Sequence, residues 1–332
     1  MALIRFARYA WFVLGYNLLV IVWGAYVRAS GSGAGCGNHW PLCKGAVIPR
    51  AAALETLVEI THRFTSGLSL IFVIGLVFWA FRRFPGGHHV RTASIVSLIF
   101  ILTEALIGAG LVLFEYVASN ASHARAFWMS GHLINTFLLL AALALTAWWA
   151  SGHEKPGKLL AGKTGRWFTL ALIGMIILGV SGAITALGDT LFPAGSLAAG
   201  LRQDASPATH IFLRLRVWHP LLALAVGVGV WWLAWKVRKA QPQPVVIKLA
   251  VAASALVAIQ LTAGATNLLL LAPIWMQLIH LLLSDLLWIV LVLLAVTVSV
   301  VDKSESEGPM SVASRGTESE RKRRATTLPW NP

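Results

Sequence analysis

Charged residues are scarce in this sequence. Only 12% of its 332 residues are charged, whereas 57% are hydrophobic, and this balance lies far outside the range of soluble domains. Acidic residues are the scarcer kind, 13 against 27 lysines and arginines, so the formal net charge is +14. The composition excludes an ordinary soluble domain and indicates a protein that crosses a membrane several times.

Cysteine is almost absent. The two cysteines, Cys36 and Cys43, both lie in the polar stretch after the first apolar run. Their seven-residue separation permits a disulfide, which the oxidising outer side of a membrane would preserve. Two unrelated thiols are the alternative. His39 lies between them and suggests a metal site, but a zinc site needs four ligands, which this stretch does not supply.

Long apolar runs fill most of the remaining sequence. A helix needs about 20 apolar residues to cross a bilayer core of about 30 Å. Runs of this kind occur at 9–28, 61–81, 93–114, 126–150, 167–187, 211–235, 246–270 and 274–300. We therefore expect an all-α polytopic membrane protein with eight transmembrane helices.

Basic residues fall on alternate connections between these runs. They cluster in the N-terminal segment and after the second, fourth and sixth runs, which places both termini in the cytoplasm. This bias and the tail motif RKRR at 321–324 account for the positive charge, so nucleic-acid binding is not expected. The tail, 301–332, has no apolar periodicity and is predicted to be disordered and to contact anionic membrane lipid.

The runs divide into two copies of one unit. VWGAYVRASG at 22–31 resembles VSGAITALGD at 180–189, and TEALIGAG at 103–110 resembles IQLTAGAT at 259–266. These matches predict two pseudo-symmetric four-helix bundles. The predicted parts are an N-terminal bundle at 1–152 with an external loop at 29–58, a cytoplasmic linker at 153–165, and a C-terminal bundle at 166–300.

Each predicted bundle has one histidine on its second helix and one on its fourth: His62, His132, His219 and His280. At 1.5 Å per residue, all four lie within roughly 3–14 Å of the outer boundary. Two such helices can hold a flat iron porphyrin between two imidazoles. A single histidine in a membrane more often forms an interhelical hydrogen bond. Four at equivalent positions favour haem ligation.

The residues beside these histidines differ between the halves. Glu59 lies three positions before His62 and Arg63 follows it, whereas Arg216 lies three positions before His219. A carboxylate one turn outward from His62 can accept protons or stabilise positive charge on a substrate. Arginine instead suits a haem propionate. We expect chemistry in the N-terminal half and a permanent haem in the C-terminal half; the alternative for Glu59 is an ion pair with Arg63.

Two more carboxyl groups, Glu104 and Asp285, are predicted to lie deeper in the membrane. An ionised carboxylate is costly there, so each is expected to be protonated or paired and to have a structural role.

These features together resemble the haem A synthase family of the cytochrome oxidase assembly pathway. The resemblance covers about residues 8–300 and rests on Glu-x-x-His-Arg at 59–63, single histidines on the fourth, sixth and eighth helices, and the cysteine pair. It implies an oxidoreductase of the cell membrane that converts a methyl group of haem O, through hydroxylated intermediates, to the formyl group of haem A. Its expected partners are the haem O substrate, haem O synthase and other cytochrome oxidase assembly proteins.

The resemblance also assigns roles to residues. It implies that a haem b cofactor is held by His219 and His280, that the substrate haem is held by His62 and His132 with Arg63 nearby, and that Glu59 is the essential carboxylate. Some members carry a second cysteine pair in the external loop of the C-terminal half, but 188–210 has none.

Two rival functions have different requirements. A dihaem b-type cytochrome that carries electrons from quinol across the membrane would need haems at different depths, whereas the four histidines here lie toward one side. A transporter built on repeats would be supported by broken helices near the midplane, and no Pro-Gly interruption of that kind occurs.

Overall fold

Residues 2–49, 53–155, 160 and 162–306 are described by the computed structural model, and they are almost entirely helical. The long helices are α1 (Ala2–Ala29), α2 (Leu54–Arg83), α3 (His89–Leu113), α4 (His123–Ala150), α5 (Gly162–Leu191), α8 (Trp218–Ala240), α9 (Pro244–Leu269) and α10 (Ile274–Ser306). Shorter helices in the connections are η1 (Ser32–Ala34), α6 (Leu197–Ala205) and α7 (Ile211–Arg216).

Within the described part of the chain, eight segments are long and apolar enough to cross a membrane. This confirms the predicted all-α polytopic membrane protein. The sixth segment runs from Ile211 to Ala240 and comprises α7 and α8, which are separated by a turn at Val217. The apolar run did not predict this break. Pro220 explains it, because proline has no N–H with which to donate to the carbonyl of Arg216 one turn earlier.

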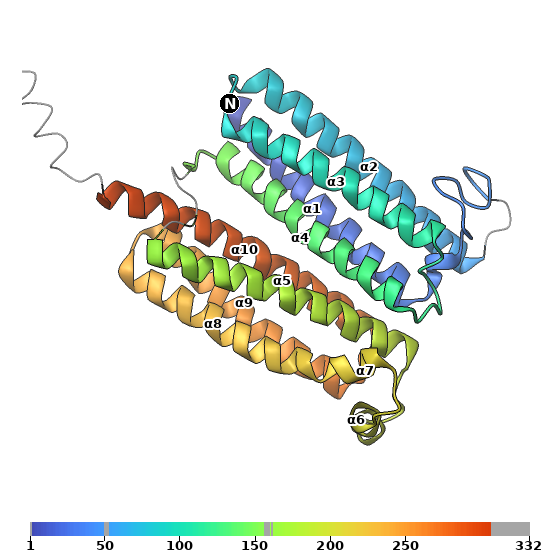
Figure 1. Ribbon diagram of the computed structural model, residues 1–332. Coiled ribbons are helices and arrows are strands. Elements are labelled where there is room, and N and C mark those ends of the chain that lie inside the picture. The colour runs from blue at the N-terminus through green and yellow to red at the C-terminus, as the bar shows by residue number, and fades with distance from the viewer. Residues whose placement is uncertain (1, 50–52, 156–159, 161, 307–332) are drawn as a thin grey trace, which may run out of the picture.

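The helices pack in two groups of four, shown one above the other in Figure 1. In the first group, α1 contacts α2, α2 contacts α3, α3 contacts α4, and α4 returns to α1. The second group repeats this order with α5, α8, α9 and α10. Because a polypeptide in lipid must satisfy its backbone groups internally, each span is helical and the side chains alone hold the groups together.

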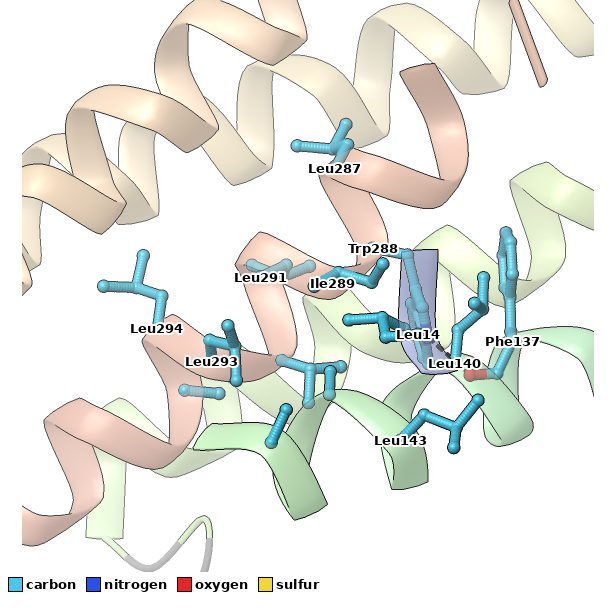
Figure 2. Packing of buried hydrophobic residues seen from close by; sticks show 14 of the residues in the cluster. Leu14, Phe137, Leu140, Leu143, Leu287, Trp288, Ile289, Leu291, Leu293 and Leu294 are labelled. Atoms are coloured by element: carbon cyan, nitrogen blue, oxygen red, sulfur yellow. Dashed lines mark hydrogen bonds between the residues drawn. The ribbon is translucent and has the colours of Figure 1, made fainter. Parts of the chain in front are cut away.

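The interface between the two groups is made mainly by α4 and α10. In these two spans most residues are buried, whereas in each of the other six about a third or fewer are. The rings of Phe137 and Trp288 stack with centres 4.9 Å apart, and Nε1 of Trp288 donates to the carbonyl oxygen of Phe137 at 2.6 Å. Figure 2 shows this pair among leucines of α4 and α10, with Leu14 of α1 beside them. The inner helix of each group therefore carries one predicted ligand, His132 or His280.

The connection between α1 and α2 and the segment with α6 and α7 lie at the same end of the molecule, opposite the N-terminal end (Figure 1). This arrangement matches the alternation expected for eight spans. Helix α10 continues to Ser306 and so includes the first six residues of the predicted disordered tail, 301–306. No glycine or proline occurs there before Gly308, so nothing in the sequence ends the helix earlier. The rest of the predicted tail, 307–332, and part of the predicted linker lie outside the described residues.

Candidate functional site

The second group of helices brings its two predicted ligands together. His219 lies on α8 and His280 on α10, and their ring centres are 6.4 Å apart with the ring planes at 83°. Bonds from imidazole nitrogen to a metal are about 2 Å long, so this separation leaves room for one metal ion between the rings. Nδ1 of His219 is 2.9 Å from Oγ of Ser181, a contact that fixes the ring and leaves Nε2 for a ligand.

Three of the four histidines lie against a glycine of a neighbouring helix. The pairs are Gly24 with His62, Gly182 with His219, and Gly264 with His280. A Cβ on these glycines would lie 2.8, 3.0 and 3.0 Å, respectively, from Cε1 of the ring. Gly24 and Gly182 are equivalent in the predicted repeat, so equivalent positions make the same contact in the two halves. Any larger residue at these sites would displace the imidazole.

No described residue holds either ring of the N-terminal pair through Nδ1, and in this respect both rings resemble that of His280 and differ from that of His219. Nδ1 of His62 and Nδ1 of His132 are buried and form no hydrogen bond within the described part of the chain. Oε1 of Glu104 lies 3.4 Å from Nδ1 of His132, which is ion-pair distance without hydrogen-bond alignment. The position equivalent to Ser181 is Trp23, which cannot accept a proton from the ring of His62 as a hydroxyl can.

Glu59 is almost fully buried near the N-terminal end of α2. Its Oε2 accepts the backbone N–H of Cys36 at 2.8 Å, and its Oε1 forms an ion pair with Arg63. The ion pair required by the alternative interpretation of this motif is therefore present. It does not exclude a role in chemistry, because the carboxylate still lies one turn outward from His62 on the same helix.

Arg63 also binds the loop closed by the two cysteines. Cys36 and Cys43 form a disulfide, as predicted. Nη1 of Arg63 donates to the carbonyl oxygens of His39 at 2.7 Å and Leu42 at 2.6 Å, both inside the ring that the disulfide closes. Arg63 therefore joins the ring to the ion pair at the start of α2.

The same loop lies directly on the first turn of α2. A Cβ on Gly35 would lie 2.4 Å from the carbonyl carbon of Glu55, so only glycine fits there. Oγ1 of Thr56 donates to the carbonyl oxygen of Gly35 at 2.7 Å, and Nζ of Lys44 donates to Oγ1 of Thr56 at 3.1 Å. The loop is thus docked on α2 next to Glu59.

Arg216 ends α7 and pairs with two aspartates. Its Nη1 donates to Oδ1 of Asp189 at 2.7 Å, and its Nη2 donates to Oδ1 of Asp204 at 2.6 Å. The guanidinium predicted to bind a propionate thus already has two carboxylate partners from the protein. The propionate role stays a prediction.

Sequence reasoning missed Arg28, whose side chain joins the two halves. Its Nη1 donates to the carbonyl oxygen of Ala186 and to Oγ1 of Thr190, and its Nη2 donates to Oε1 of Gln277, each at 2.9 Å. A charged residue near the end of an apolar run was the available signal. The partner roles of Ser181 and the two aspartates gave no signal in the sequence, because they depend on how separate helices meet.

No group of three or more histidine, cysteine, aspartate or glutamate side chains that could hold a bare metal ion occurs in the described ranges. Paired histidines fit a different kind of centre, because a porphyrin supplies four nitrogens and takes only axial ligands from the protein. The site therefore consists of two histidine pairs. In the C-terminal pair Ser181 contacts the ring of His219, and in the N-terminal pair Glu104 lies beside His132.

Comparison with known proteins identifies a family. Residues 7–292 match the family model described as cytochrome oxidase assembly protein. The chain is 27% identical over 285 residues to the heme A synthase of Lysinibacillus sphaericus, covering 84% of this chain and 91% of that protein. It is 37% identical over 155 residues to the heme A synthase of Halalkalibacterium halodurans, which covers 47% of this chain and 50% of that protein.

A longer relative has a different name. The protein named protoheme IX farnesyltransferase in Thermus thermophilus is 50% identical over 291 residues, which are 88% of this chain but 48% of that protein. The chain thus spans about half the length of this relative. The stretch that matches the relative, 291 residues, is about as long as the stretch that matches the family model, residues 7–292. Since the family match covers most of the chain, the protein belongs to the cytochrome oxidase assembly protein family that includes the heme A synthases.

Proposed function

We propose that this protein is a haem A synthase, a membrane oxidoreductase that converts a methyl group of haem O to the formyl group of haem A. In this proposal the C-terminal bundle keeps a haem b cofactor between His219 and His280, and the N-terminal bundle binds haem O between His62 and His132. The family membership and the two histidine pairs support it together.

The observation that carries the proposal is the pairing of His219 with His280. Two rings 6.4 Å apart, one fixed through its Nδ1 by Ser181, have the separation that axial ligation of one iron requires. Bound haem b would supply one-electron transfer next to the substrate half. The protein's part is to fix both imidazoles and to keep the two haem sites in adjoining bundles.

The N-terminal half is suited to binding a haem that must arrive and leave. Neither of its two imidazoles has a hydrogen bond at Nδ1 within the described residues, whereas the C-terminal half has one ring, that of His219, held in this way. Conversion of a methyl to a formyl group replaces two hydrogens on carbon with one oxygen, in total a four-electron oxidation whose electrons pass to an external acceptor, so protons must leave the edge of the porphyrin. Glu59, one turn outward from His62, is the carboxylate that we assign to accept them.

The external loop supports this role for Glu59. The backbone N–H of Cys36 donates to one carboxylate oxygen of Glu59, and the guanidinium of Arg63 pairs with the other. These two contacts fix the direction of the carboxylate. The ring closed by the disulfide covers this end of α2 and limits the access of water. Fixed direction and exclusion of water both favour transfer of a proton at a defined atom.

For the membrane orientation, we propose that both termini are cytoplasmic and that the haem sites lie toward the outer face. The basic residues on alternate connections support this orientation, and so does the disulfide, which an oxidising compartment preserves.

Farnesyl transfer is the second candidate activity, because a relative named for it is 50% identical. We assign that activity to the part of the relative that this chain does not match, since the matched part coincides with the cytochrome oxidase assembly family. Farnesylation of protohaem yields haem O, the substrate proposed here. The relation therefore supports an enzyme that makes haem O as a partner of this chain.

One experiment separates these activities. The full chain is purified from cells that supply haem O, and extracted haem is identified by mass and by its pyridine haemochrome spectrum. We expect haem B together with haem O, its hydroxylated form or haem A. Haem B alone, at two per protein, would indicate a dihaem cytochrome. In a parallel sample given haem B and farnesyl diphosphate we expect no haem O, and its formation would support the transferase instead.

A further inference from the structure

Glu104 on α3 and Gln260 on α9 occupy equivalent positions in the two halves, and each contacts the histidine of the next long helix. Oε1 of Glu104 lies 3.4 Å from Nδ1 of His132. Nε2 of Gln260 lies 3.1 Å from the carbonyl oxygen of His280 and 3.4 Å from its Nε2. Both side chains contact the histidine of the next long helix, but at different ring nitrogens, and a carboxylate that only accepts hydrogen bonds is replaced by a neutral amide.

The carboxylate of Glu104 is held in place from α4. Oγ1 of Thr136 donates to its Oε1 at 2.5 Å, and Nδ2 of Asn135 donates to its Oε2. Asn135 is itself fixed, because its Oδ1 accepts a hydrogen bond from Oγ1 of Thr103 at 2.5 Å. Three polar side chains therefore hold one carboxylate against the histidine of the same bundle.

The second half lacks this support. Leu283 and Ser284 stand where Asn135 and Thr136 stand in the first half. Leucine cannot donate a hydrogen bond, and a carboxylate at position 260 would lose that partner. The two halves thus differ in the group behind the fourth-helix histidine, as well as in the residues around the second-helix histidine.

We infer that Glu104 is a positioning residue for His132. Oε1 of its carboxylate lies 3.4 Å from Nδ1 without hydrogen-bond alignment in this structure, and it comes to accept the Nδ1–H when the ring turns to place Nε2 on the iron of the substrate haem. This inference rests on the proposed function, in which His132 is a ligand of that haem. A carboxylate behind an imidazole fixes its tautomer and makes it a stronger electron donor. The iron of the substrate haem then favours its ferric form more than it would with a histidine ligand that contacts only an amide.

The competing explanation is that Glu104 only ties α3 to α4 through Thr136 and Asn135. That role requires no histidine, and it predicts an effect on stability alone. Ligand strength and stability can be measured separately, because the bound haem reports its own ligation through its absorbance and its reduction equilibrium.

The test uses the full-length protein purified with its C-terminal haem, and ferric haem B as the probe titrated into the N-terminal half. In Glu104→Gln we expect the dissociation constant for the probe to rise about 10–100-fold, the usual effect of losing such a partner. The ferric-to-ferrous equilibrium of the bound probe should shift about tenfold toward ferrous, which is 59 mV for one electron. The spectrum of the C-terminal haem, unchanged, reports that the variant is folded.

Two further variants control the result. Thr136→Val removes one donor to Glu104 but keeps the carboxylate. It should therefore raise the dissociation constant for the probe by a smaller factor than Glu104→Gln does. Gln260→Glu should leave the probe unchanged and shift the C-terminal haem toward ferric. Wild-type affinity and wild-type reduction equilibrium in Glu104→Gln would overturn the inference, whether or not its melting temperature falls.

His132→Ala separates failure of the inference from failure of the proposed function. If His132→Ala binds the probe as tightly as the wild type does, the assignment of His132 as a ligand is wrong, and the role of Glu104 falls with it. If His132→Ala loses the probe and Glu104→Gln keeps it, only the role of Glu104 is wrong.

Discussion

The two halves of this protein share the order of their helices and the positions of their histidines, but differ in what surrounds those histidines. In the C-terminal half, Ser181 holds His219 and Gln260 lies against His280, both of them neutral polar groups. In the N-terminal half the carboxylate of Glu104 lies beside His132, and that of Glu59 lies one turn from His62 on the same helix. The same order of helices can thus place neutral groups beside the histidines of one half and carboxylates beside those of the other, and we relate this difference to the proposed roles of the two halves as cofactor site and substrate site.

The most severe test of this comparison is removal of the charge from Glu59. Glu59→Gln keeps the shape of the side chain but cannot accept protons, so we expect haem A formation per mole of protein to fall about 10²–10⁴-fold. Haem O or its hydroxylated form should accumulate, and the haem b of the C-terminal half should remain. Extracted haem is quantified by chromatography and mass.

Arg63→Gln is the matched control for Glu59. It removes the same ion pair but leaves the carboxylate, so haem A per mole of folded enzyme should fall by a smaller factor than in Glu59→Gln, and protein yield should fall as well. Near-normal haem A in Glu59→Gln would remove that carboxylate from the mechanism and leave the ion pair as its role.

A variant at Arg216 tests whether its charge serves the ion pairs with Asp189 and Asp204 or binds a haem propionate in the C-terminal half. Arg216→Gln leaves Asp189 and Asp204 without their cation, and loss of one partner from a largely buried ion pair costs about 3–5 kcal/mol. We expect a lower melting temperature with haem b retained in the folded fraction. An unchanged melting temperature with loss of haem b would instead support the propionate role.

The disulfide belongs to the N-terminal half alone in this chain. A short loop of this kind contributes roughly 2–3 kcal/mol, because the bridge restricts the unfolded loop. In a Cys36→Ser, Cys43→Ser variant we expect faster hydrogen exchange and faster trypsin cleavage at Lys44, with the spectrum of haem b unchanged. If the haem b spectrum is lost together with the loop, the disulfide stabilises the whole molecule and not only the N-terminal site.

A smaller effect is expected from Ser181, which holds the ring of His219. Ser181→Ala removes that partner but no ligand, so the affinity for haem b should fall about tenfold. Ser254→Ala is the matched control, because its hydroxyl donates only to the carbonyl oxygen of Ala250 in its own helix. Equal retention of haem b in both variants would show that Ser181 does not support the ligand.

The smallest effect is expected from Asp285 on α10. This side chain is fully buried, and neither of its oxygens has a hydrogen-bond partner among the described residues. A carboxyl group in such a place is stable only when neutral, so Asp285→Asn should change the melting temperature little and leave both haems in place. Loss of haem A formation in this variant would reveal a role in the reaction that the packing does not indicate.

The sequence alone predicted the eight spans, because apolar runs of transmembrane length have few alternatives in a bilayer. The disulfide could be predicted for a similar reason, since two cysteines in one short external stretch have only each other. The turn at Val217 was missed because the apolar run continues through it. The partners of Arg216 and His219 were missed because side chains from separate helices meet only after packing, and no local pattern encodes that meeting.

The central claim is that the two histidine pairs hold different haems, and a matched pair of variants tests it most directly. His132→Ala and His280→Ala are produced in cells that supply haem O, and the haem extracted per mole of protein is measured for each. The account predicts that His132→Ala keeps haem B and loses haem O and haem A, whereas His280→Ala loses haem B. Loss of the same haem from both variants, or haem B as the only haem in the wild type, would contradict it.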